Sequence, residues 1–304
     1  MFSIIIPALN EWYYLNMTLD SIYNNVDSDL LEDIIVVDDF SDRENYDFIE
    51  THPMRHKITL IKNESKKGPS HSRNIWAKNA KGEVLIFIDA HMYCYDFDLE
   101  KLKWLWKYLE KWSIQGTVWN MENKQVKWEI YKIKDYLFNS TWTTPKKIEN
   151  GITKSPAVAW GFTVMKKETF NHIGWFNKMF NSWWVEDLEI SLRLCMYWYE
   201  TYYTNIFGLA HYFKKSFNYE VKTQDVLYNK YLVYKLYFED VYIKSEDVIN
   251  KLENYYWKES IDKINKIIKN NKEINEFIIN HKDNFVHDIN WYFFKFNEYY
   301  NEIS

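Results

Sequence analysis

The chain has 304 residues, a formal net charge of −5 and an isoelectric point near 6.0, which argue against a nucleic-acid-binding protein that relies on bulk electrostatic attraction. Its two cysteines, Cys94 and Cys195, are too few for a disulfide framework and favour a reducing compartment. The chain opens on a strand pattern at Phe2 with no basic leader, and no apolar stretch is long enough to span a bilayer, so we expect a cytoplasmic protein without a transmembrane segment.

The first 120 residues alternate short apolar runs with amphipathic stretches. Near-continuous β-branched runs separated by helices are typical of a mostly parallel sheet with helices on both faces, so the pattern predicts an α/β fold. The expected strands are 2–6, 34–37, 58–61, 84–88 and 117–121, and the expected helices are 12–23, 43–51, 69–79 and 99–112.

The remainder of the chain is less periodic. Residues 122–155 are polar, Lys-rich and aromatic, and we interpret them as a long excursion over the active-site face. The expected elements that follow are a strand at 156–164 and helices at 185–197, at 224–238 and from 245 to the end. We therefore expect one α/β domain over 1–240 and a helical region over 241–304 that packs on this domain or on a second subunit.

The aromatic content is high, with 15 Trp, 25 Tyr and 19 Phe. Core packing together with a compositional bias explains such a content without any function. The alternative is an aromatic-lined groove that binds a sugar or a peptide. The sequence leaves both interpretations open.

The pair Asp89 and His91 follows the apolar run 84–88 directly. Side chains two positions apart in an extended segment point to the same side, and ligands of open α/β sheets gather at the carboxyl ends of strands. A carboxylate with an imidazole suits a divalent transition metal, manganese rather than calcium, and such a metal commonly neutralises phosphate charge. A polar turn without a ligand is the alternative.

Two acidic residues, Asp38 and Asp39, follow another apolar run in the same way. Adjacent carboxylates repel each other and need a donor between them, for which a pyrimidine imide N–H is one candidate. The alternative is a helix N-cap made by Ser41 or Asp42, and both interpretations can hold together.

The segment 68–74 opens an expected helix, whose N-terminus favours anions. Arg73, one of only four arginines in the chain, carries a guanidinium fork that matches phosphate oxygens. A surface arginine that pairs with a nearby glutamate is the alternative.

The acids Glu186 and Asp187 begin another expected helix, after two tryptophans. Such acids usually stabilise the helix dipole, but a partly apolar pocket would raise the pKa of one of them toward that of a useful base. His211 is the last candidate: a lone histidine is normally structural, yet beside the Asp89/His91 pair it would complete a metal site.

Five segments carry a resemblance to known families. The segments 3–11 (SIIIPALNE) and 34–42 (IIVVDDFSD) resemble glycosyltransferase family 2 over about the first 95 residues. The Asp-x-His pair and the segment 184–193 (WVEDLEISLR) look more like the polypeptide N-acetylgalactosaminyltransferases, whose matching segment reads WGGENLEISFR; the segment 208–213 (GLAHYF) parallels that family's VGHxFR. The resemblance implies a nucleotide-sugar-dependent glycosyltransferase of the GT-A fold, Rossmann-like. The C-terminal helical extension is expected from the sequence pattern alone, because residues 245–304 match neither family.

The resemblance also implies a nucleotide-binding half over 1–120, an acceptor half over 121–240 and a role for each matching residue. Asp39 would contact uracil, and Arg73 would help to hold the nucleotide. Trp160 and Gly161 would lie in the acceptor or sugar pocket, where the related enzymes carry a Gly-Gly pair. The residues implied to contact the nucleotide-sugar are Pro7, Ala8, Asn10, Glu11, Asp39, Arg73, Asp89, Ala90, Trp160 and Gly161; those implied to ligate Mn²⁺, with Mg²⁺ as the alternative ion, are Asp89, His91 and His211.

The acidic pair at 186 and 187 bears on the stereochemistry of transfer. The peptide-modifying family has Glu-Asn here and retains the anomeric configuration, whereas inverting members of family 2 carry a second acid that acts as the base. Glu186 and Asp187 would both face the reacting sugar, and Asp187 would take the acceptor proton, so the resemblance favours inversion over retention.

The leading hypothesis is therefore a UDP-sugar-dependent transferase that acts on a peptide or protein side chain. A saccharide or lipid-linked acceptor is the alternative. A nucleotidyltransferase is disfavoured because the first loop, 7–11, has neither Gly nor Lys. A non-catalytic nucleotide-sugar-binding scaffold belongs to another class of function, as does a helical tail over 241–304 that forms a homodimer.

Overall fold

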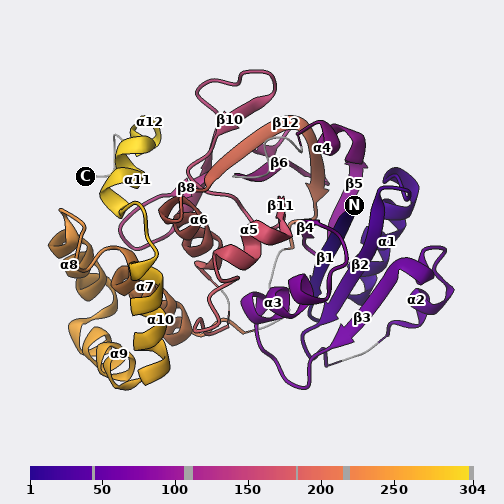
Figure 1. Cartoon of the computed structure of the whole chain (residues 1–304). Helices are drawn as coiled ribbons and strands as arrows, with labels where there is room; N and C mark the ends of the chain where they lie inside the picture. The colour runs from indigo at the N-terminus through magenta and orange to yellow at the C-terminus, as the bar shows by residue number, and fades with distance from the viewer. Residues whose placement is uncertain (43–44, 106–111, 183, 215–219, 301–304) are drawn as a thin grey trace.

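The computed structural model describes residues 1–42, 45–105, 112–182, 184–214 and 220–300, which form a central sheet flanked by helices (Figure 1). The sheet has ten strands, and its main path runs in the order β10 (Ile152–Lys154), β12 (Glu200–His211), β6 (Trp112–Asn120), β11 (Phe162–Lys166), β4 (Val84–Ile88), β1 (Phe2–Ala8), β2 (Leu31–Asp38) and β3 (Ile58–Lys62). The short strands β5 (Met92–Asp96) and β7 (Lys127–Trp128) pair with β12 and β6, and β8 (Ile130–Ile133) forms a separate hairpin with β9 (Ser140–Thr143).

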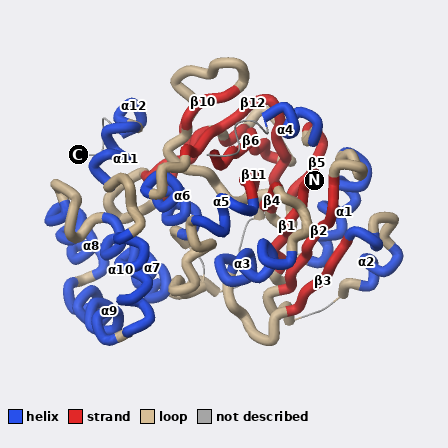
Figure 2. Tube along the Cα trace, in the orientation of Figure 1, coloured by secondary structure: helices blue, strands red, loops and turns tan. Residues whose placement is uncertain are grey.

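Helices cover both faces of the sheet (Figure 2). They are α1 (Trp12–Asn25), α2 (Asp47–Thr51), α3 (Pro69–Asn79), α4 (Leu99–Leu105), α5 (Lys167–His172), α6 (Glu186–Met196), α7 (Thr223–Tyr237), α8 (Ser245–Tyr256), α9 (Lys258–Asn270), α10 (Lys272–Asp283), α11 (Ile289–Lys295) and α12 (Asn297–Tyr300), with a 3₁₀ turn at Arg55–Lys57. Alternate residues of β1 point to opposite faces: Ile4 packs with α1 and α4, whereas Ile5 packs with α3, α5 and α6. None of the helices among the described residues combines the length and the apolarity needed to cross a bilayer.

The four strands β4, β1, β2 and β3 pair in parallel, as do β6 and β12. All five residues of β4 and most of β1 are buried. This burial agrees with the prediction, since continuous apolar runs are typical of parallel strands that are covered on both faces. The predicted α/β class is confirmed. The prediction of a mostly parallel sheet is corrected, because the sheet is mixed: β11 runs antiparallel to both β4 and β6.

The reason for the mixed sheet lies in the connection that leads to β11. A parallel strand needs a crossover, usually a helix, to return to the same edge. Here the chain from the end of β6 runs through the short strands β7, β8, β9 and β10 instead, and β11 enters the sheet from the opposite direction. The excursion expected over 122–155 thus contains strands of its own.

Several predicted boundaries differ from the structure. The helix predicted at 99–112 ends at Leu105 among the described residues, with 106–111 outside them, and Trp112 already begins β6. The helix predicted at 43–51 begins at Asp47, and residues 43–44 lie outside the described part. The strand predicted at 156–164 begins only at Phe162, since the residues before it form a loop.

The C-terminal helices α8 to α12 pack against the rest of the molecule through one large apolar cluster. Leu188 and Leu192 of α6 share this cluster with Leu232 of α7, Ile268 of α9 and Tyr292 of α11. A buried polar contact reinforces it, because the Arg193 guanidinium on α6 lies 3.1 Å from His281 Nε2 on α10. The helices after residue 240 therefore pack directly on the helix that begins with Glu186 and Asp187.

Candidate active site

A cavity of about 1080 Å³ opens at the carboxyl ends of β1, β4 and β12. Its lining includes residues from both halves of the chain, from Pro7 to Asp225. Open α/β sheets bind ligands at this edge because strand ends leave loops and side chains there to converge. The cavity is therefore the candidate active site.

Three predicted metal ligands, Asp89, His91 and His211, come together in this cavity. One ligand atom of each lies within 4.8 Å of the others, and His211 Nε2 is 3.5 Å from Asp89 Oδ2. The two imidazole centroids are 4.6 Å apart. The prediction that residue 211 lies beside the strand-end pair is confirmed, although the pair and the distal histidine belong to opposite halves of the sequence.

The protonation states of this cluster suit metal binding. Burial acts to raise the pKa of Asp89, but the hydrogen bond from His211 and the nearby charges of His91 and Arg73 outweigh it and hold the pKa well below its usual range. Burial lowers the pKa of His211, so its imidazole is neutral at pH 7. One carboxylate oxygen and two imidazole nitrogens form a donor set for a divalent transition metal.

Glu11 orients the His91 ring of this cluster through a contact with its Nδ1 atom. Its carboxylate lies 3.1 Å from His91 Nδ1 and also accepts a hydrogen bond from Lys214. A carboxylate at one imidazole nitrogen fixes the ring and leaves the other nitrogen for a metal. Glu11 lines the cavity, but the structure gives it this second role, which the sequence interpretation as a nucleotide-sugar contact did not include.

The other N-terminal residues of the expected nucleotide site divide into two groups. Pro7, Ala8 and Ala90 line the cavity. Asn10 is not among the cavity-lining residues that the structure describes: its side chain exchanges hydrogen bonds with Asp42, and its backbone N–H donates to Ser41 Oγ. Asn10 therefore holds two loops together, and its expected contact with the nucleotide-sugar stays a prediction.

Each carboxylate of the pair at 38 and 39 has its own protein donors. Asp38 accepts from the backbone and hydroxyl of Ser41. Asp39 accepts four hydrogen bonds at 2.8–3.1 Å, from Asn63 Nδ2, Lys67 N, Gly68 N and Ser72 Oγ. An external donor is thus not needed to separate the charges. The N-cap alternative is also wrong, because α2 begins at Asp47 after Tyr46. Asp39 still lines the cavity, and its contact with uracil stays a prediction.

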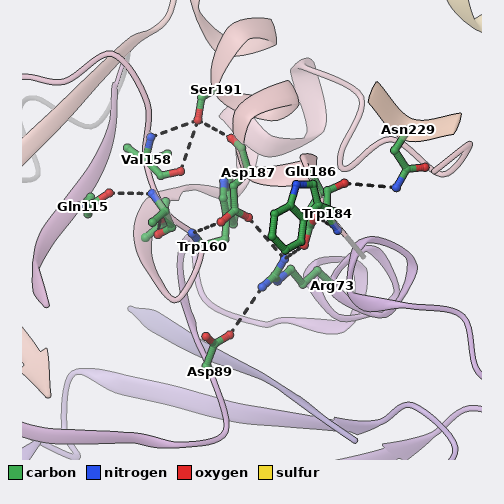
Figure 3. Close-up of polar contacts among 12 residues, drawn as sticks. Arg73, Asp89, Gln115, Val158, Trp160, Trp184, Glu186, Asp187, Ser191 and Asn229 are labelled. Carbon is green, nitrogen blue, oxygen red and sulfur yellow. Dashed lines mark hydrogen bonds and ion pairs between the residues drawn. The ribbon is translucent and has the colours of Figure 1, made fainter. Parts of the chain in front are cut away.

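Arg73 lies buried between the metal cluster and the acidic pair (Figure 3). Its guanidinium is 3.6 Å from Asp89 Oδ1, 3.6 Å from Glu186 Oε1 and 3.9 Å from Asp187 Oδ1. The alternative of a surface arginine with one glutamate is corrected to a buried arginine among three carboxylates. Arg73 therefore links the two ends of the site electrostatically.

The acidic pair begins α6 after a strained turn. Trp184 and Val185 have φ of 101° and 66°, values that bulky side chains rarely adopt. Glu186 Oε2 accepts from the Trp184 N–H at 2.9 Å and Asp187 Oδ2 from the Trp160 N–H at 3.3 Å. The second oxygen of each acid is buried without a hydrogen-bond partner among the described residues.

The two acids have raised pKa values. For Asp187, burial and then the charge of Glu186 raise the pKa to about 8, against the opposing charge of Arg73. Burial likewise raises the pKa of Glu186. A carboxylate that lines a cavity and has a pKa close to neutral has the properties of a general base.

The loop before β11 contains Trp160 and Gly161, of which only Gly161 lines the cavity. The Trp160 side chain is fully buried, with its ring 4.7 Å from Phe87 and 4.4 Å from Phe176, so the prediction that it lies in the acceptor or sugar pocket is wrong. Gly161 does line the cavity. A Cβ there would lie 3.1 Å from Asp89 Oδ2, which explains why glycine fits beside the metal cluster.

Two buried polar residues that the sequence did not single out position this loop. Gln115 Oε1 accepts from the Ala159 N–H, and Ser191 Oγ accepts from the Val158 N–H and donates to the Asp187 carbonyl (Figure 3). Ser191 follows Asp187 by four positions and so shares its helix face, which is a weak signal in the sequence. Gln115 carries a polar amide between the buried residues Ile114 and Val118 of β6, which is the stronger signal.

Aromatic side chains form part of the lining of the cavity. They come from the excursion and from the turn before α6: Tyr131, Phe138, Trp142, Phe180 and Trp184. Burial and the charge of Asp187 hold the pKa of Tyr131 well above its usual range. The prediction that the excursion passes over the active-site face is confirmed by this lining, although the sequence did not identify the individual residues.

Comparisons with known proteins agree with this arrangement. The model of glycosyl transferase family 2 matches residues 3–174. The chain is 30% identical over 213 residues to the inactive polypeptide N-acetylgalactosaminyltransferase-like protein 5 of Macaca fascicularis, covering 64% of this chain and 47% of that protein. It is 29% identical over 216 residues to polypeptide N-acetylgalactosaminyltransferase 12 of Mus musculus, covering 63% and 36%. The chain thus spans less than half the length of these relatives.

Solved structures show the same fold. The structure of GalNAc-T7 with UDP, GalNAc and Mn²⁺ superposes with a TM-score of 0.78 at 19% identity, over 99% of this chain and 57% of that one. S. aureus TarS superposes with a TM-score of 0.56 at 15% identity, over 84% and 43%. The predicted GT-A fold is confirmed.

Proposed function

The chain belongs to glycosyl transferase family 2, and we propose that it is a metal-dependent enzyme that moves a sugar, an N-acetylhexosamine in the first instance, from a UDP-sugar to a peptide or protein side chain. One observation carries the proposal: a cluster of Asp89, His91 and His211 and a carboxylate with a raised pKa, Asp187, open into the same cavity. The donor site and the reacting acceptor are thereby assigned to adjacent parts of one cavity.

The metal cluster would receive the diphosphate of the donor. When bound, Mn²⁺ or Mg²⁺ supplies Lewis-acid stabilisation of the charge that develops on the leaving diphosphate, a contribution of several kcal/mol. The chain's own part is to hold three ligands in one cluster, to fix the His91 ring through Glu11 and to keep the Asp89 carboxylate ionised. Gly161 leaves room beside that carboxylate.

The proposed chemical step assigns Asp187 as the base. The acceptor hydroxyl attacks the anomeric carbon as its proton passes to Asp187 and as the bond from the sugar to phosphate breaks. The Trp160 N–H holds one oxygen of this carboxylate, and Arg73 holds the charge of the pair at 186 and 187. Attack from the face opposite the leaving group inverts the anomeric configuration, and we propose inversion for this reason.

A peptide acceptor is favoured by the names of several curated relatives, which are called polypeptide N-acetylgalactosaminyltransferases. The aromatic wall of the cavity is consistent with an acceptor that presents apolar side chains. A saccharide or lipid-linked acceptor is the outcome that an acceptor screen would reveal if peptides fail.

A non-catalytic scaffold is the competing class, and one relative is itself named inactive. The retained cluster, the buried Arg73 and the unpartnered oxygen of Asp187 favour catalysis, because a scaffold has no need for a carboxylate with a raised pKa. UDP release from a panel of UDP-sugars with Mn²⁺ decides between them. We expect metal-dependent release from at least one donor, and none from any donor would leave only the scaffold.

Two further expectations remain proposals. A cytoplasmic location is supported by the two cysteines, which are both buried and unpaired. A homodimer through 241–304 is supported by exposed apolar side chains there, such as Ile243, Trp257 and Ile267. Sedimentation of the full chain tests the second expectation, with a monomer at micromolar concentration as the contradicting result.

A further inference from the structure

A second cavity, of about 520 Å³, lies at the other end of β12 from the metal cluster. Glu200, the first residue of the strand, lines it, whereas His211 at the last position belongs to the active site. At a rise of about 3.3 Å per residue, the two ends of this 12-residue strand are roughly 35 Å apart. The two cavities are therefore separate sites.

A stack of three flat rings forms one side of this second cavity, which we name the aromatic groove. The His287 ring stacks on Trp291 at 3.5 Å and 7°, and on Trp198 at 4.8 Å and 23°. Lys295 Nζ lies 4.6 Å from the centre of the Trp291 ring. Phe294 also lines the groove and is 77% exposed. The C-terminal segment and the body of the molecule thus build the groove together.

Trp198 is the open end of this stack. It is 57% exposed, and its backbone has a φ of 72°. That conformation costs roughly 1–2 kcal/mol for a residue other than glycine, and it closes α6, where glycine is the usual residue. A large ring that is both exposed and held in an unfavourable conformation contributes little to the core, so a contact outside the fold is the reason to keep it.

Charged groups line the groove beside the rings. The Glu200 carboxylate forms ion pairs with Lys154 at 2.6 Å and Lys295 at 3.2 Å, and it accepts a hydrogen bond from the Tyr202 hydroxyl. Burial alone would raise the pKa of Glu200, but these contacts lower it to about 2, so the carboxylate is ionised at neutral pH. The groove therefore offers both donors and an acceptor, and its two lysines outweigh the charge of the one carboxylate.

We propose that the aromatic groove is a saccharide-binding site, in which a pyranose ring stacks on the open face of Trp198 and its hydroxyl groups bond to Lys154 and Glu200. A sugar ring has C–H groups on its face and hydroxyls at its edge. The C–H groups are attracted to the negative face of an aromatic ring, and the hydroxyls need charged or polar partners. The cavity volume falls within the range of about 300–1,000 Å³ for small-ligand sites.

Other occupants fit the groove less well. A second copy of the chain that covered it with apolar side chains would bury Lys154, Glu200 and Lys295 without adding partners, which is unfavourable. The excess positive charge disfavours a cation, although aromatic rings bind cations elsewhere. A peptide strand is recognised chiefly through backbone hydrogen bonds, whereas the groove offers ring faces and side-chain charges.

The test is saturation-transfer NMR on the full chain with the methyl glycosides of glucose, galactose, N-acetylglucosamine and N-acetylgalactosamine. The variant is Trp198→Gly, which relieves the unfavourable backbone conformation and so keeps the fold. The matched control is Trp257→Gly, because Trp257 is also exposed, at 76%, and also has a positive φ, of 70°, but lies outside the groove.

We expect at least one glycoside to bind the wild-type chain and Trp257→Gly, and Trp198→Gly to bind it roughly tenfold more weakly or not at all. UDP release at the active site stays unchanged in both variants, which separates this inference from the proposed function. Equal binding by Trp198→Gly, or no binding by the wild type, contradicts the proposal. A Trp198-dependent dimer in sedimentation, or Trp198-dependent binding of an unglycosylated oligoproline instead of a sugar, would assign the groove to another occupant.

Discussion

The metal cluster and the acidic pair, the two sides of the active site, shift the pKa of a carboxyl group in opposite directions. Asp89 and Asp187 are both partly buried and both lie within 4 Å of the Arg73 guanidinium, yet the pKa of the first is held well below its usual range and that of the second is raised to about 8. The difference lies in the remaining neighbours: two imidazoles beside Asp89, and a second carboxylate, Glu186, beside Asp187. Environments that move two pKa values apart separate an ionised ligand from a base.

Arg73 is the group that both sides share. Its charge lowers the pKa of each neighbouring carboxylate, so it cannot be the source of the contrast. Arg73 instead couples the metal cluster to the acidic pair, because its guanidinium interacts with carboxylates of both. A change in charge at one of them alters the electrostatic interaction of the guanidinium with the other. Substitutions on one side at a time separate the two contributions, and the largest effect is expected at the metal cluster.

Replacement of Asp89, the ionised carboxylate of the metal cluster, should abolish metal binding. We expect Asp89→Asn to lower metal-dependent UDP release on the order of 10³-fold, since Lewis-acid stabilisation of several kcal/mol is lost. The matched control is Asp96→Asn on β5, a half-exposed aspartate away from the cavity lining. Steady-state UDP release at several Mn²⁺ concentrations measures both, and a wild-type rate in Asp89→Asn would exclude it as a ligand.

Replacement of the proposed base, Asp187, should leave binding of the donor intact. Asp187→Asn is expected to lower sugar transfer about 10²–10⁴-fold, the usual contribution of general-base catalysis, because an amide cannot take the acceptor proton. Binding of UDP and Mn²⁺, measured by calorimetry, should stay within a few-fold of wild type. Transfer at the wild-type rate would remove Asp187 as the base and with it the case for inversion.

The support behind the metal cluster gives a smaller effect. We expect Glu11→Gln to weaken Mn²⁺ binding by about 10–100-fold, as is typical when a carboxylate that orients a metal-binding histidine is lost. The readout is the Mn²⁺ affinity from calorimetry. Saturating Mn²⁺ should restore most of the UDP release, and a failure to restore it would mean that Glu11 acts on the donor itself.

The pH dependence of transfer tests the raised pKa. In the wild type the rate should rise as pH passes through about 8, because Asp187 acts only when deprotonated. In Glu186→Gln a neighbouring negative charge is gone, so the pKa of Asp187 falls and the rising limb moves to lower pH. If the rising limb of the pH–rate profile lies at the same pH in Glu186→Gln as in the wild type, the proposed coupling between Glu186 and Asp187 is contradicted.

The smallest effect is expected at Trp160. Its side chain packs in the core among Phe87 and Phe176, and only its backbone N–H reaches Asp187. Trp160→Phe should therefore leave the preference among UDP-sugars unchanged, with transfer within a few-fold of wild type. A changed donor preference would restore the sugar-pocket role that the sequence implied.

The sequence predicts the parallel strands β1, β2, β3 and β4 better than it predicts the later part of the chain, for physical reasons. Buried parallel strands require apolar runs, and their carboxyl ends must meet at one edge, so the apolar run 84–88 was enough to place Asp89 and His91 at a strand end. His211 could be placed only through the resemblance, since its partners lie more than a hundred residues away in the sequence.

Other features of the fold and of the site have no periodic signal in the sequence. The direction of β11, the four donors around Asp39 and the burial of Trp160 follow from tertiary packing. The dipeptide at 160–161 aligns with a Gly-Gly pair in related enzymes, but only Gly161 faces the metal cluster. Motif matching could not show that the bulky residue of the pair turns into the core.

The most direct test of the central claim is Mn²⁺ binding followed by electron paramagnetic resonance, with wild type and His211→Ala side by side. We predict one bound Mn²⁺ per wild-type chain, with affinity weakened at least about tenfold in His211→Ala, since one of the ligands in the cluster is removed. Equal Mn²⁺ affinity in the two proteins would contradict the account, because the ion would then not be held by the cluster of residues 89, 91 and 211.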